Sequence, residues 1–175
     1  MPAGRALPAL GLVLLALSGC GWAPLYADPE TGPAAAELAA IRVDPIADRI
    51  GQRLEMALRN ALNPTDAPVK QRYRLHTTLT VSLSNLGLQT QGTAVLGRLD
   101  VFANYILIDN TTGANLLASG VHSQNSFSLD PNQYSTVVAE GDAGVRSVVE
   151  ITREMVARLT LFMERRAAAR PAKPG

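Results

Sequence analysis

A regular alternation of side-chain character over residues 73–83 constrains the fold more than any other stretch of this chain. The odd-numbered residues there are mostly apolar, and the even-numbered ones are polar. Because successive side chains of a β-strand point to opposite faces of a sheet, the pattern predicts a long strand with one apolar and one polar face. The apolar series is Tyr73, Leu75, Thr77, Leu79, Val81 and Leu83, and the polar series is Arg72, Arg74, His76, Thr78, Thr80 and Ser82.

Three more strands are predicted near this one. Alternating residues indicate one strand over about 93–108 and another over about 115–129. The stretch 109–113, Asp-Asn-Thr-Thr-Gly, is a strong turn signal between them, and the polar, glycine-containing stretch 85–92 suggests a hairpin connection. These long strands are therefore expected to form an antiparallel meander. A short first strand is expected at 41–43, where Ile-Arg-Val alternates.

Two amphipathic helices are predicted, one before and one after the meander. The first runs from about 47 to 63 and ends at Asn63-Pro64, because the residue before a proline avoids the helical region. The second begins near Ser135 or Asp142 and ends at about Arg166. Their apolar residues recur at helical spacing, as Ile50, Leu54, Ala57, Leu58 and Ala61 in the first and Val148, Ile151, Met155, Leu159 and Phe162 in the second.

This order of elements predicts an α+β fold. We expect a two-layer sandwich in which a four-stranded, mostly antiparallel sheet carries two helices packed on one face. Two helices cannot also cover the second face, so the polar face of the sheet must meet water or a polar partner. Four charged residues of the last helix follow one another at four-residue spacing and are expected to form solvated ion pairs, namely Arg146, Glu150, Glu154 and Arg158.

The beginning of the chain has the pattern of a lipoprotein precursor. A short leader with one positive charge is followed by an apolar run that is too short to span a membrane but has the length of a signal-peptide core. The stretch 17–20, Leu-Ser-Gly-Cys, resembles the bacterial lipobox, in which the cysteine thiol receives a diacylglyceryl group. The alternative is an ordinary secretory signal followed by a chance free thiol. In enteric-type lipoproteins, an aspartate directly after the lipidated cysteine favours retention in the inner membrane. This chain has Gly21 at that position, which favours a location in the outer membrane.

This interpretation gives four segments. Residues 1–19 are expected to be a signal peptide, and residues 20–40 the lipidated Cys20 with an extended linker. Residues 41–166 are expected to form a single α+β domain, and residues 167–175 a disordered tail. Several acyl chains on Cys20 would anchor the protein firmly to a membrane, because each buried methylene contributes about 0.8 kcal/mol.

Composition and motifs exclude several functions. The chain has 16 Lys and Arg against 15 Asp and Glu, and this near-neutral balance argues against nucleic-acid binding. We find no nucleophile elbow, phosphate-binding loop or dinucleotide fingerprint, so we expect neither catalysis nor a cofactor. His76 and His122 are the only histidines. Both fall on the predicted polar face, where a metal site is conceivable but exposed strand residues are the better interpretation.

Three stretches together resemble the LPS-assembly lipoprotein family LptE, in particular its shorter, alphaproteobacterial-type members. The first is 20–26, Cys-Gly-Trp-Ala-Pro-Leu-Tyr, which is similar to the opening motif of the family. The second is 48–54, Asp-Arg-Ile-Gly-Gln-Arg-Leu, which is similar to its first helix. The third is 98–109, which contains Ala-Asn-Tyr-Ile-Leu-Ile-Asp and leads to a Thr-Gly turn.

The resemblance implies a role without catalysis. LptE proteins sit inside the outer-membrane β-barrel LptD, help it fold, and act with it to place lipopolysaccharide in the outer leaflet. The family is also thought to bind lipopolysaccharide through basic side chains. The stretches 85–97 and 130–139 contain no Lys or Arg, so candidate contacts to lipopolysaccharide or the partner are Arg72, Arg74 and Arg98. A solvated sheet face is an equally good explanation of these arginines.

Two other functions remain open at this stage. A lipid-tethered auxiliary subunit of another envelope lipid transporter could share the anchor and the mixed fold. A tethered enzyme would need a pocket that joins His76, His122 and an acidic side chain. The resemblance favours the LptE-like function over both of these alternatives. It implies an outer-membrane, lipid-anchored protein that faces the periplasm.

Overall fold

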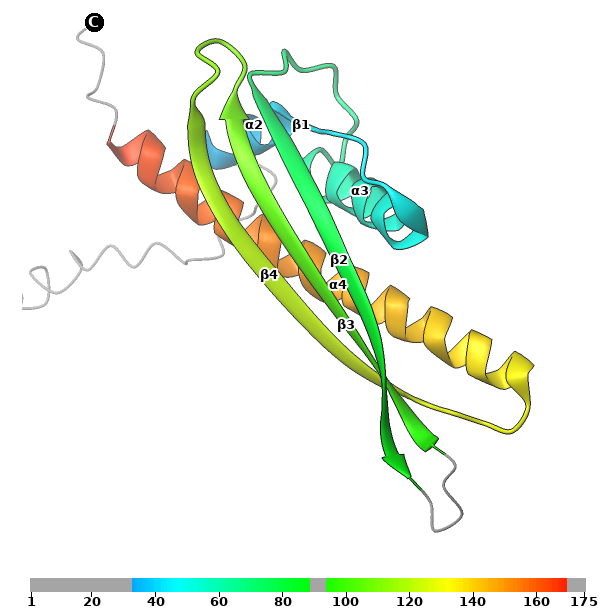
Figure 1. Ribbon diagram of the computed structural model, residues 1–175. Coiled ribbons are helices and arrows are strands. Elements are labelled where there is room, and N and C mark those ends of the chain that lie inside the picture. Colours follow the sequence, from blue (N-terminus) through cyan, green and yellow to red (C-terminus); the bar gives the residue numbers. More distant parts are fainter. Residues whose placement is uncertain (1–32, 89–93, 170–175) are drawn as a thin grey trace, which may run out of the picture. The chain divides into compact units, whose positions relative to one another are not determined.

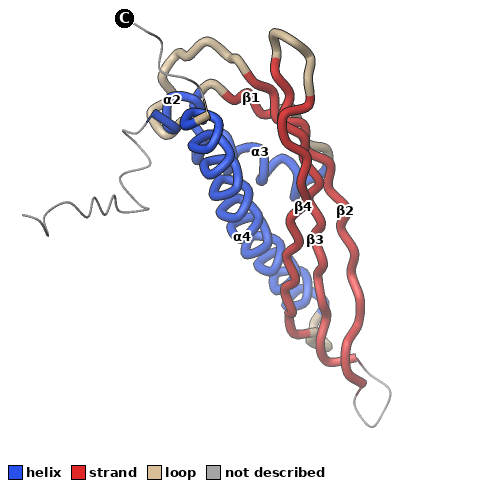
Figure 2. Tube along the Cα trace, turned by 90° about the vertical axis from the view of Figure 1, so that its left-hand side faces the viewer, coloured by secondary structure: helices blue, strands red, loops and turns tan. Residues whose placement is uncertain are grey.

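The computed structural model describes residues 33–88 and 94–169. Helices lie on one side of a single sheet, with the other side of the sheet uncovered by any described element (Figure 1, Figure 2). The predicted α+β sandwich is therefore confirmed. The elements in chain order are α2 (Pro33–Ala39), β1 (Ile41–Val43), α3 (Asp48–Leu62), β2 (Tyr73–Leu88), β3 (Ala94–Asp109), β4 (Asn115–Ser128) and α4 (Gln133–Ala168).

The sheet has the strand order β1-β2-β3-β4. The pairs β2–β3 and β3–β4 are antiparallel, as expected for a meander, whereas β1 is parallel to β2. The parallel pair follows from the connection, since the chain crosses back through α3 before it enters β2. The prediction of a mostly antiparallel sheet is confirmed.

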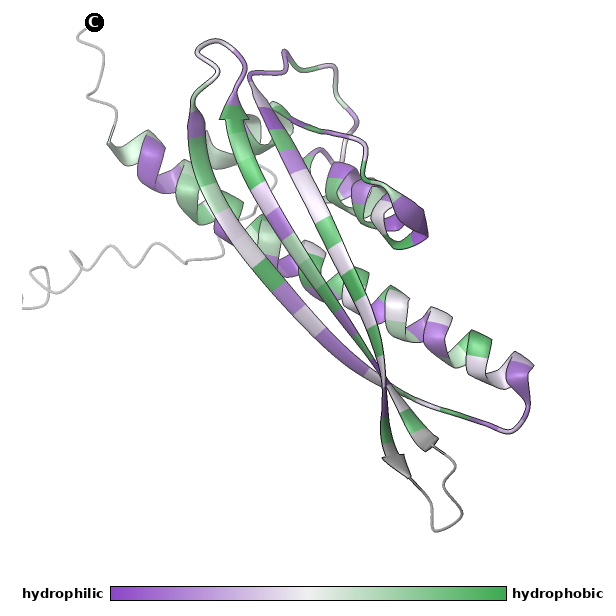
Figure 3. Ribbon diagram, viewed as in Figure 1, coloured by the Kyte–Doolittle hydropathy of each residue, from purple (hydrophilic) through white to green (hydrophobic). Residues whose placement is uncertain are grey.

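The face of the sheet that the helices cover, here called the inner face, carries the odd-numbered residues of β2, β3 and β4. All five odd-numbered residues of β3 from Leu99 to Leu107 are buried, and so are Leu75 and Val121. The stripes predicted for the helices supply the opposing side chains, including Leu54, Leu58, Ile151, Met155 and Leu159. Apolar and polar bands alternate along the strands in Figure 3, as the sequence pattern predicts.

The short helix α2 corrects one expectation. An extended linker was expected up to residue 40, but residues 33–39 are helical, and Ala34, Leu38 and Ala40 are buried in the core. The sequence Pro-Ala-Ala-Ala-Glu-Leu-Ala favours a helix, and Ala34 and Leu38 lie on one face because they are four residues apart. Glu37 fixes this helix to β2, since it accepts a hydrogen bond from the Tyr73 hydroxyl at 2.9 Å.

The last helix begins earlier than expected, at Gln133. Asn132 caps it, because its side-chain oxygen accepts a hydrogen bond from the amide of Tyr134. The helix ends at Ala168, two positions beyond the expected end near Arg166. Within the described ranges, no helix combines the length and the apolar character that crossing a membrane requires. The predicted signal peptide, Cys20, the linker up to residue 32 and the tail from residue 170 lie outside the described residues.

Candidate functional site

The uncovered side of the sheet, here called the open face, is the candidate functional site. It carries the even-numbered side chains of β2, β3 and β4, which are mostly polar and mostly exposed. Thr78, Asn104 and Gly120 occupy neighbouring positions on the three strands and form its small-residue centre. Apolar side chains interrupt the polar surface, and the most exposed of the large ones are Phe102 at 44% and Leu96 at 39%. The expected bare polar face is therefore present.

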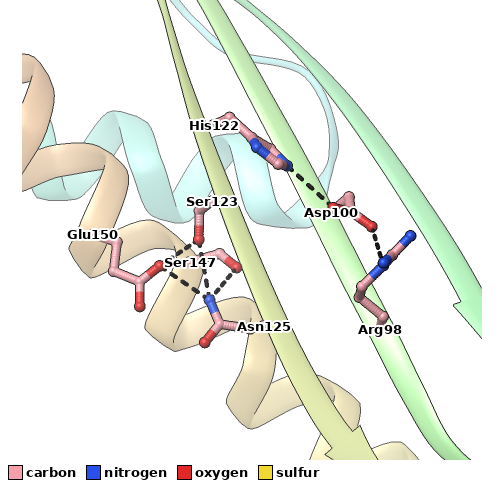
Figure 4. Close-up of polar contacts among 7 residues, drawn as sticks. All are labelled: Arg98, Asp100, His122, Ser123, Asn125, Ser147 and Glu150. Atoms are coloured by element: carbon pink, nitrogen blue, oxygen red, sulfur yellow. Dashed lines mark hydrogen bonds and ion pairs between the residues drawn. The ribbon is translucent and has the colours of Figure 1, made fainter. Parts of the chain in front are cut away.

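A charged cluster around Asp100 lies on this face (Figure 4). Asp100 is only 9% exposed. The Arg98 Nε donates to its Oδ2 at 2.9 Å, and the His122 Nε2 lies 3.1 Å from its Oδ1. The His122 ring stacks on Phe102 with a centroid distance of 4.0 Å and an interplanar angle of 6°. Both oxygens of Asp100 therefore have partners, and the carboxylate links Arg98 of its own strand to His122 of β4.

A second cluster lies toward the other end of the open face. The His76 Nδ1 lies 3.4 Å from the Asp44 Oδ2, and the Arg74 Nε lies 3.7 Å from the same oxygen. Beside them is a shallow depression of about 330 Å³, and it is lined by His76, Thr78, Asn104, Tyr105, Ile106, Ala118 and Ser119. The depression is open to solvent and contains no nucleophile paired with a base.

The structure does not bring the two histidines together. His122 pairs in register with Phe102, whereas His76 pairs with Ile106 on the other side of the same strand. Each histidine contacts a different carboxylate, Asp100 or Asp44. Among residues 33–88 and 94–169, no group of three or more His, Cys, Asp or Glu side chains could hold a metal ion.

The three candidate arginines occupy three different environments. Arg72 is held by α2, because its Nη2 lies 2.8 Å from the Glu37 carboxylate. Arg98 pairs in register with Ser84 of β2, which is ten positions from Arg74, so at about 3.3 Å per residue the two arginines are roughly 33 Å apart along the sheet. The three guanidinium groups therefore cannot bind one phosphate together.

A buried polar network between β4 and α4 was not predicted. Asn125 lies on the inner face, and its Nδ2 lies within 3.1 Å of Ser123 Oγ, Ser147 Oγ and Glu150 Oε2 (Figure 4). The Ser123 hydroxyl also donates to the Glu150 carboxylate. Ser123 and Asn125 occupy positions of β4 where the alternation predicts apolar residues, and that break in the pattern was the available signal.

The same side of α4 corrects the expectation of solvated ion pairs. Arg158 does pair with Glu154 at 2.8 Å, but it also donates to the Gly120 carbonyl at 2.9 Å. Arg146 donates to the Ser126 carbonyl at 3.1 Å. These carbonyls lie on the outer edge of β4, beside which no other strand lies among residues 33–88 and 94–169. The helix arginines therefore cap the sheet edge, where carbonyls without a neighbouring strand are available as acceptors. Glu150 instead accepts from Ser123 and Asn125.

Comparisons with solved structures show the same fold in lipoproteins. A crystal structure of a candidate lipoprotein from Caulobacter crescentus CB15 superposes with a TM-score of 0.61 at 20% sequence identity, and it covers 81% of this chain and 100% of that one. The solution structure of an uncharacterized lipoprotein B from Nitrosomonas europaea gives a TM-score of 0.54 at 17% identity and covers 71% of this chain and 82% of that one. No curated protein matches the sequence.

The family assignment comes from the sequence itself. Residues 38–159 match a family model described as LptE, Lipopolysaccharide-assembly. The matched range begins within α2, contains the whole sheet and α3, and ends within α4. The match therefore covers more than half of the chain and every element that builds the open face. This chain belongs to the LptE family of lipopolysaccharide-assembly proteins.

Proposed function

We propose that this chain is an outer-membrane lipoprotein that occupies the lumen of the LptD β-barrel. In this role it supports the folding of the barrel and the insertion of lipopolysaccharide into the outer leaflet. Membership of a lipopolysaccharide-assembly family supports the general role. The observation that carries the specific proposal is the open face, a long sheet surface that none of the described helices covers. The assignment of this chain to the shorter, alphaproteobacterial type of the family stays a prediction.

The chemistry of the open face suits a barrel interior. Side chains inside an outer-membrane barrel are polar and the lumen is wet. Thr78, Thr80 and Ser82 present hydroxyl groups on the open face, and the Asp100 cluster adds a fixed carboxylate with its cationic partner. A surface of this kind can exchange hydrogen bonds with water for hydrogen bonds with a polar wall at little cost. An apolar partner would instead leave these groups without hydrogen bonds.

The predicted lipid anchor completes the proposal. Cys20 would carry the acyl chains, so that the folded domain faces the periplasm from the outer membrane. The twelve residues between Cys20 and Pro33 include several Pro, Gly and Ala residues and give the domain reach from the membrane surface. A Cys20→Ser variant is expected to leave the membrane fraction.

Contact with lipopolysaccharide is proposed for two single arginines. Arg74 and Arg98 lie on the open face with side chains that are 49% and 37% exposed, so each can offer guanidinium donors to a phosphate. Arg72 is bound by Glu37 of α2, and Arg98 is likewise bound by Asp100, so each would offer a phosphate only its remaining donors. Single contacts are proposed because Arg74 and Arg98 are too far apart to share one phosphate group.

Depletion and replacement in cells test the function. Depleting the protein is expected to lower the amount of correctly folded LptD and to make the outer membrane permeable, and the wild-type chain is expected to restore both. A Thr80→Arg variant places a bulky charge at the middle of the open face and is expected to fail. Gln52→Arg makes a similar change at an exposed position of α3, away from the open face, and is expected to succeed.

Two results would contradict the proposal. One is a normal LptD level with an intact permeability barrier after depletion. The other is equal rescue by the Thr80 and Gln52 variants, which would mean that the open face does not contact the partner. Purified Thr80→Arg protein must melt like the wild type, because the substituted side chain points to solvent in the free chain.

A further inference from the structure

The outer edge of β2 offers a place for another strand. β1 pairs with β2 only at three positions, from Tyr73 to Leu75. The last contact is the hydrogen bond from the Asp44 amide to the Leu75 carbonyl at 3.0 Å, after which Pro45 follows and the chain leaves the sheet. β2 itself continues to Leu88. Among the described residues, none pairs with this edge beyond Leu75.

The register shows which main-chain groups point to this edge. The Tyr73 amide donates to the Ala40 carbonyl, and the Leu75 carbonyl accepts from Asp44, so odd-numbered residues of β2 point their polar groups toward β1. In an antiparallel strand the amide and carbonyl of one residue point the same way, and alternate residues repeat the direction. The amides and carbonyls of Thr77, Leu79, Val81, Leu83 and Asn85 therefore point to the free edge.

The side chains of the same residues are apolar and partly uncovered. Val81 is 42% exposed and Leu83 is 51% exposed, although both lie on the inner face and continue the apolar series of the core. A strand that pairs with β2 past the end of β1 would lie beside these two side chains. It would remove part of their apolar surface from water. It would therefore gain main-chain hydrogen bonds and apolar burial together.

The two outer edges of the sheet, on β4 and on β2, differ in how they are protected. On β4, Arg146 and Arg158 of the last helix occupy edge carbonyls. On β2, the stretch 77–86, Thr-Thr-Leu-Thr-Val-Ser-Leu-Ser-Asn-Leu, contains no charged residue and no proline, and its register with β3 shows no bulge. Proteins ordinarily protect a long edge strand with charges, proline or bulges. An edge without these devices is suited to strand addition.

We propose that the β2 edge from Thr77 to Asn85 binds an extended segment of a partner polypeptide by strand addition. A row of amides and carbonyls at a sheet edge is complementary to an extended main chain. The segment should carry uncharged, partly apolar side chains on the side of Val81 and Leu83. The inference rests on the proposed function for the partner, which is then a segment of the barrel protein inside its own lumen.

Proline substitution tests the main-chain contacts. Leu83→Pro removes an amide that points to the free edge and takes no part in the β2–β3 ladder, so we expect the fold to tolerate it. Ser126→Pro is the matched control, because the Ser126 amide points to the opposite edge, as its carbonyl does, at the same level of the sheet. Full-length tagged protein is isolated from outer membranes, and co-purified barrel is measured. Leu83→Pro is expected to lower the amount of co-purified barrel about tenfold, equivalent to about 1.4 kcal/mol. Ser126→Pro is expected to lower this amount much less.

A photo-crosslinking residue at Val81 provides a second measurement, and Val81→Lys provides a variant without proline. The crosslinker is expected to join the barrel protein, and the lysine is expected to weaken co-purification as Leu83→Pro does. Thermal melting of each variant checks that the domain is folded. If the Leu83 variant unfolds, the crosslink and the lysine variant still decide the question.

The outcomes separate the inference from the proposed function. If the wild-type chain binds the barrel but all edge variants bind equally and Val81 crosslinks to nothing in it, strand addition is wrong and the proposed function stands. If Val81 instead crosslinks to a second copy of this chain, the proposed occupant is wrong. If the wild-type chain does not bind the barrel at all, both proposals are wrong.

Discussion

Replacing Asn125 by alanine tests the buried network that joins β4 to the last helix. The amide has two hydrogens, so it can donate to two of its three neighbours, Ser123, Ser147 and Glu150, at one time. Its oxygen also accepts from the Arg146 Nε at 3.2 Å. The substitution removes these bonds and leaves the Ser147 hydroxyl, which is 0% exposed, without its partner. With about 1 kcal/mol for each lost bond, we expect a loss of about 3 kcal/mol in the free energy of unfolding.

Urea and thermal unfolding of the mature chain, produced without its leader, measure this loss. For a chain of this size, 1 kcal/mol corresponds to about 2–4 °C, so the melting temperature should fall by about 6–12 °C. Asn104→Ala is the matched control, because Asn104 lies exposed on the open face, and we expect a change below about 0.5 kcal/mol.

A double-mutant cycle with Ser147→Ala separates the network from simple truncation. The two substitutions should cost less together than the sum of their separate effects, since each breaks the same bond. If Asn125→Ala costs no more than Asn104→Ala, or if the two effects add fully, the network does not stabilise the contact between β4 and α4.

Three further predictions follow from single contacts. Tyr73→Phe removes the hydrogen bond to Glu37 and should cost about 1 kcal/mol in a urea unfolding experiment; an unchanged midpoint would contradict the fixed position of α2. Gly97→Val should cost about 2–3 kcal/mol, because even a Cβ at Gly97 would lie 2.8 Å from two ring carbons of the buried Phe127; spectra and stability like the wild type would contradict that packing. Asp109 accepts two backbone amides of the following turn, which hold its pKa below the ordinary value of 3.8. Its stabilising effect is therefore present above about pH 4 and lost as the pH falls further, and Asp109→Asn should make the acid-induced loss of stability shallower; an unchanged pH profile would contradict this assignment.

The elements that could be predicted are those set by local periodicity. The alternation over residues 73–83 and the apolar stripes of the two long helices each depend on neighbours within a few positions. They therefore gave the strands, the helices and the bare face correctly. The boundaries of the last helix were less certain, because Gly141 weakens the pattern near its start and the Asn132 cap becomes visible only in the structure.

The parts that could not be predicted depend on residues far apart in the chain. α2 looked like a linker because its alanine-rich stretch has little pattern, and it is held by burial of Leu38 and by Glu37 bonding to Tyr73, which lies 36 residues later. The spacing between Arg74 and Arg98 requires the register of β2 and β3. The sequence therefore names these arginines as candidate contacts but carries no information on the distance between them.

Cysteine labelling tests most directly whether a partner encloses the open face. Cys20 is the only cysteine in the chain, and the predicted lipid would block its thiol, so a single introduced cysteine can be followed alone. Thr80→Cys lies on the open face, and Gln52→Cys lies exposed on α3. We predict that a maleimide labels Thr80→Cys rapidly in the free protein and slowly in the complex isolated from outer membranes, whereas Gln52→Cys keeps a larger share of its free rate. Equal protection at both positions would mean that the open face is not specifically covered, and rapid labelling of Thr80→Cys in the complex would contradict the account.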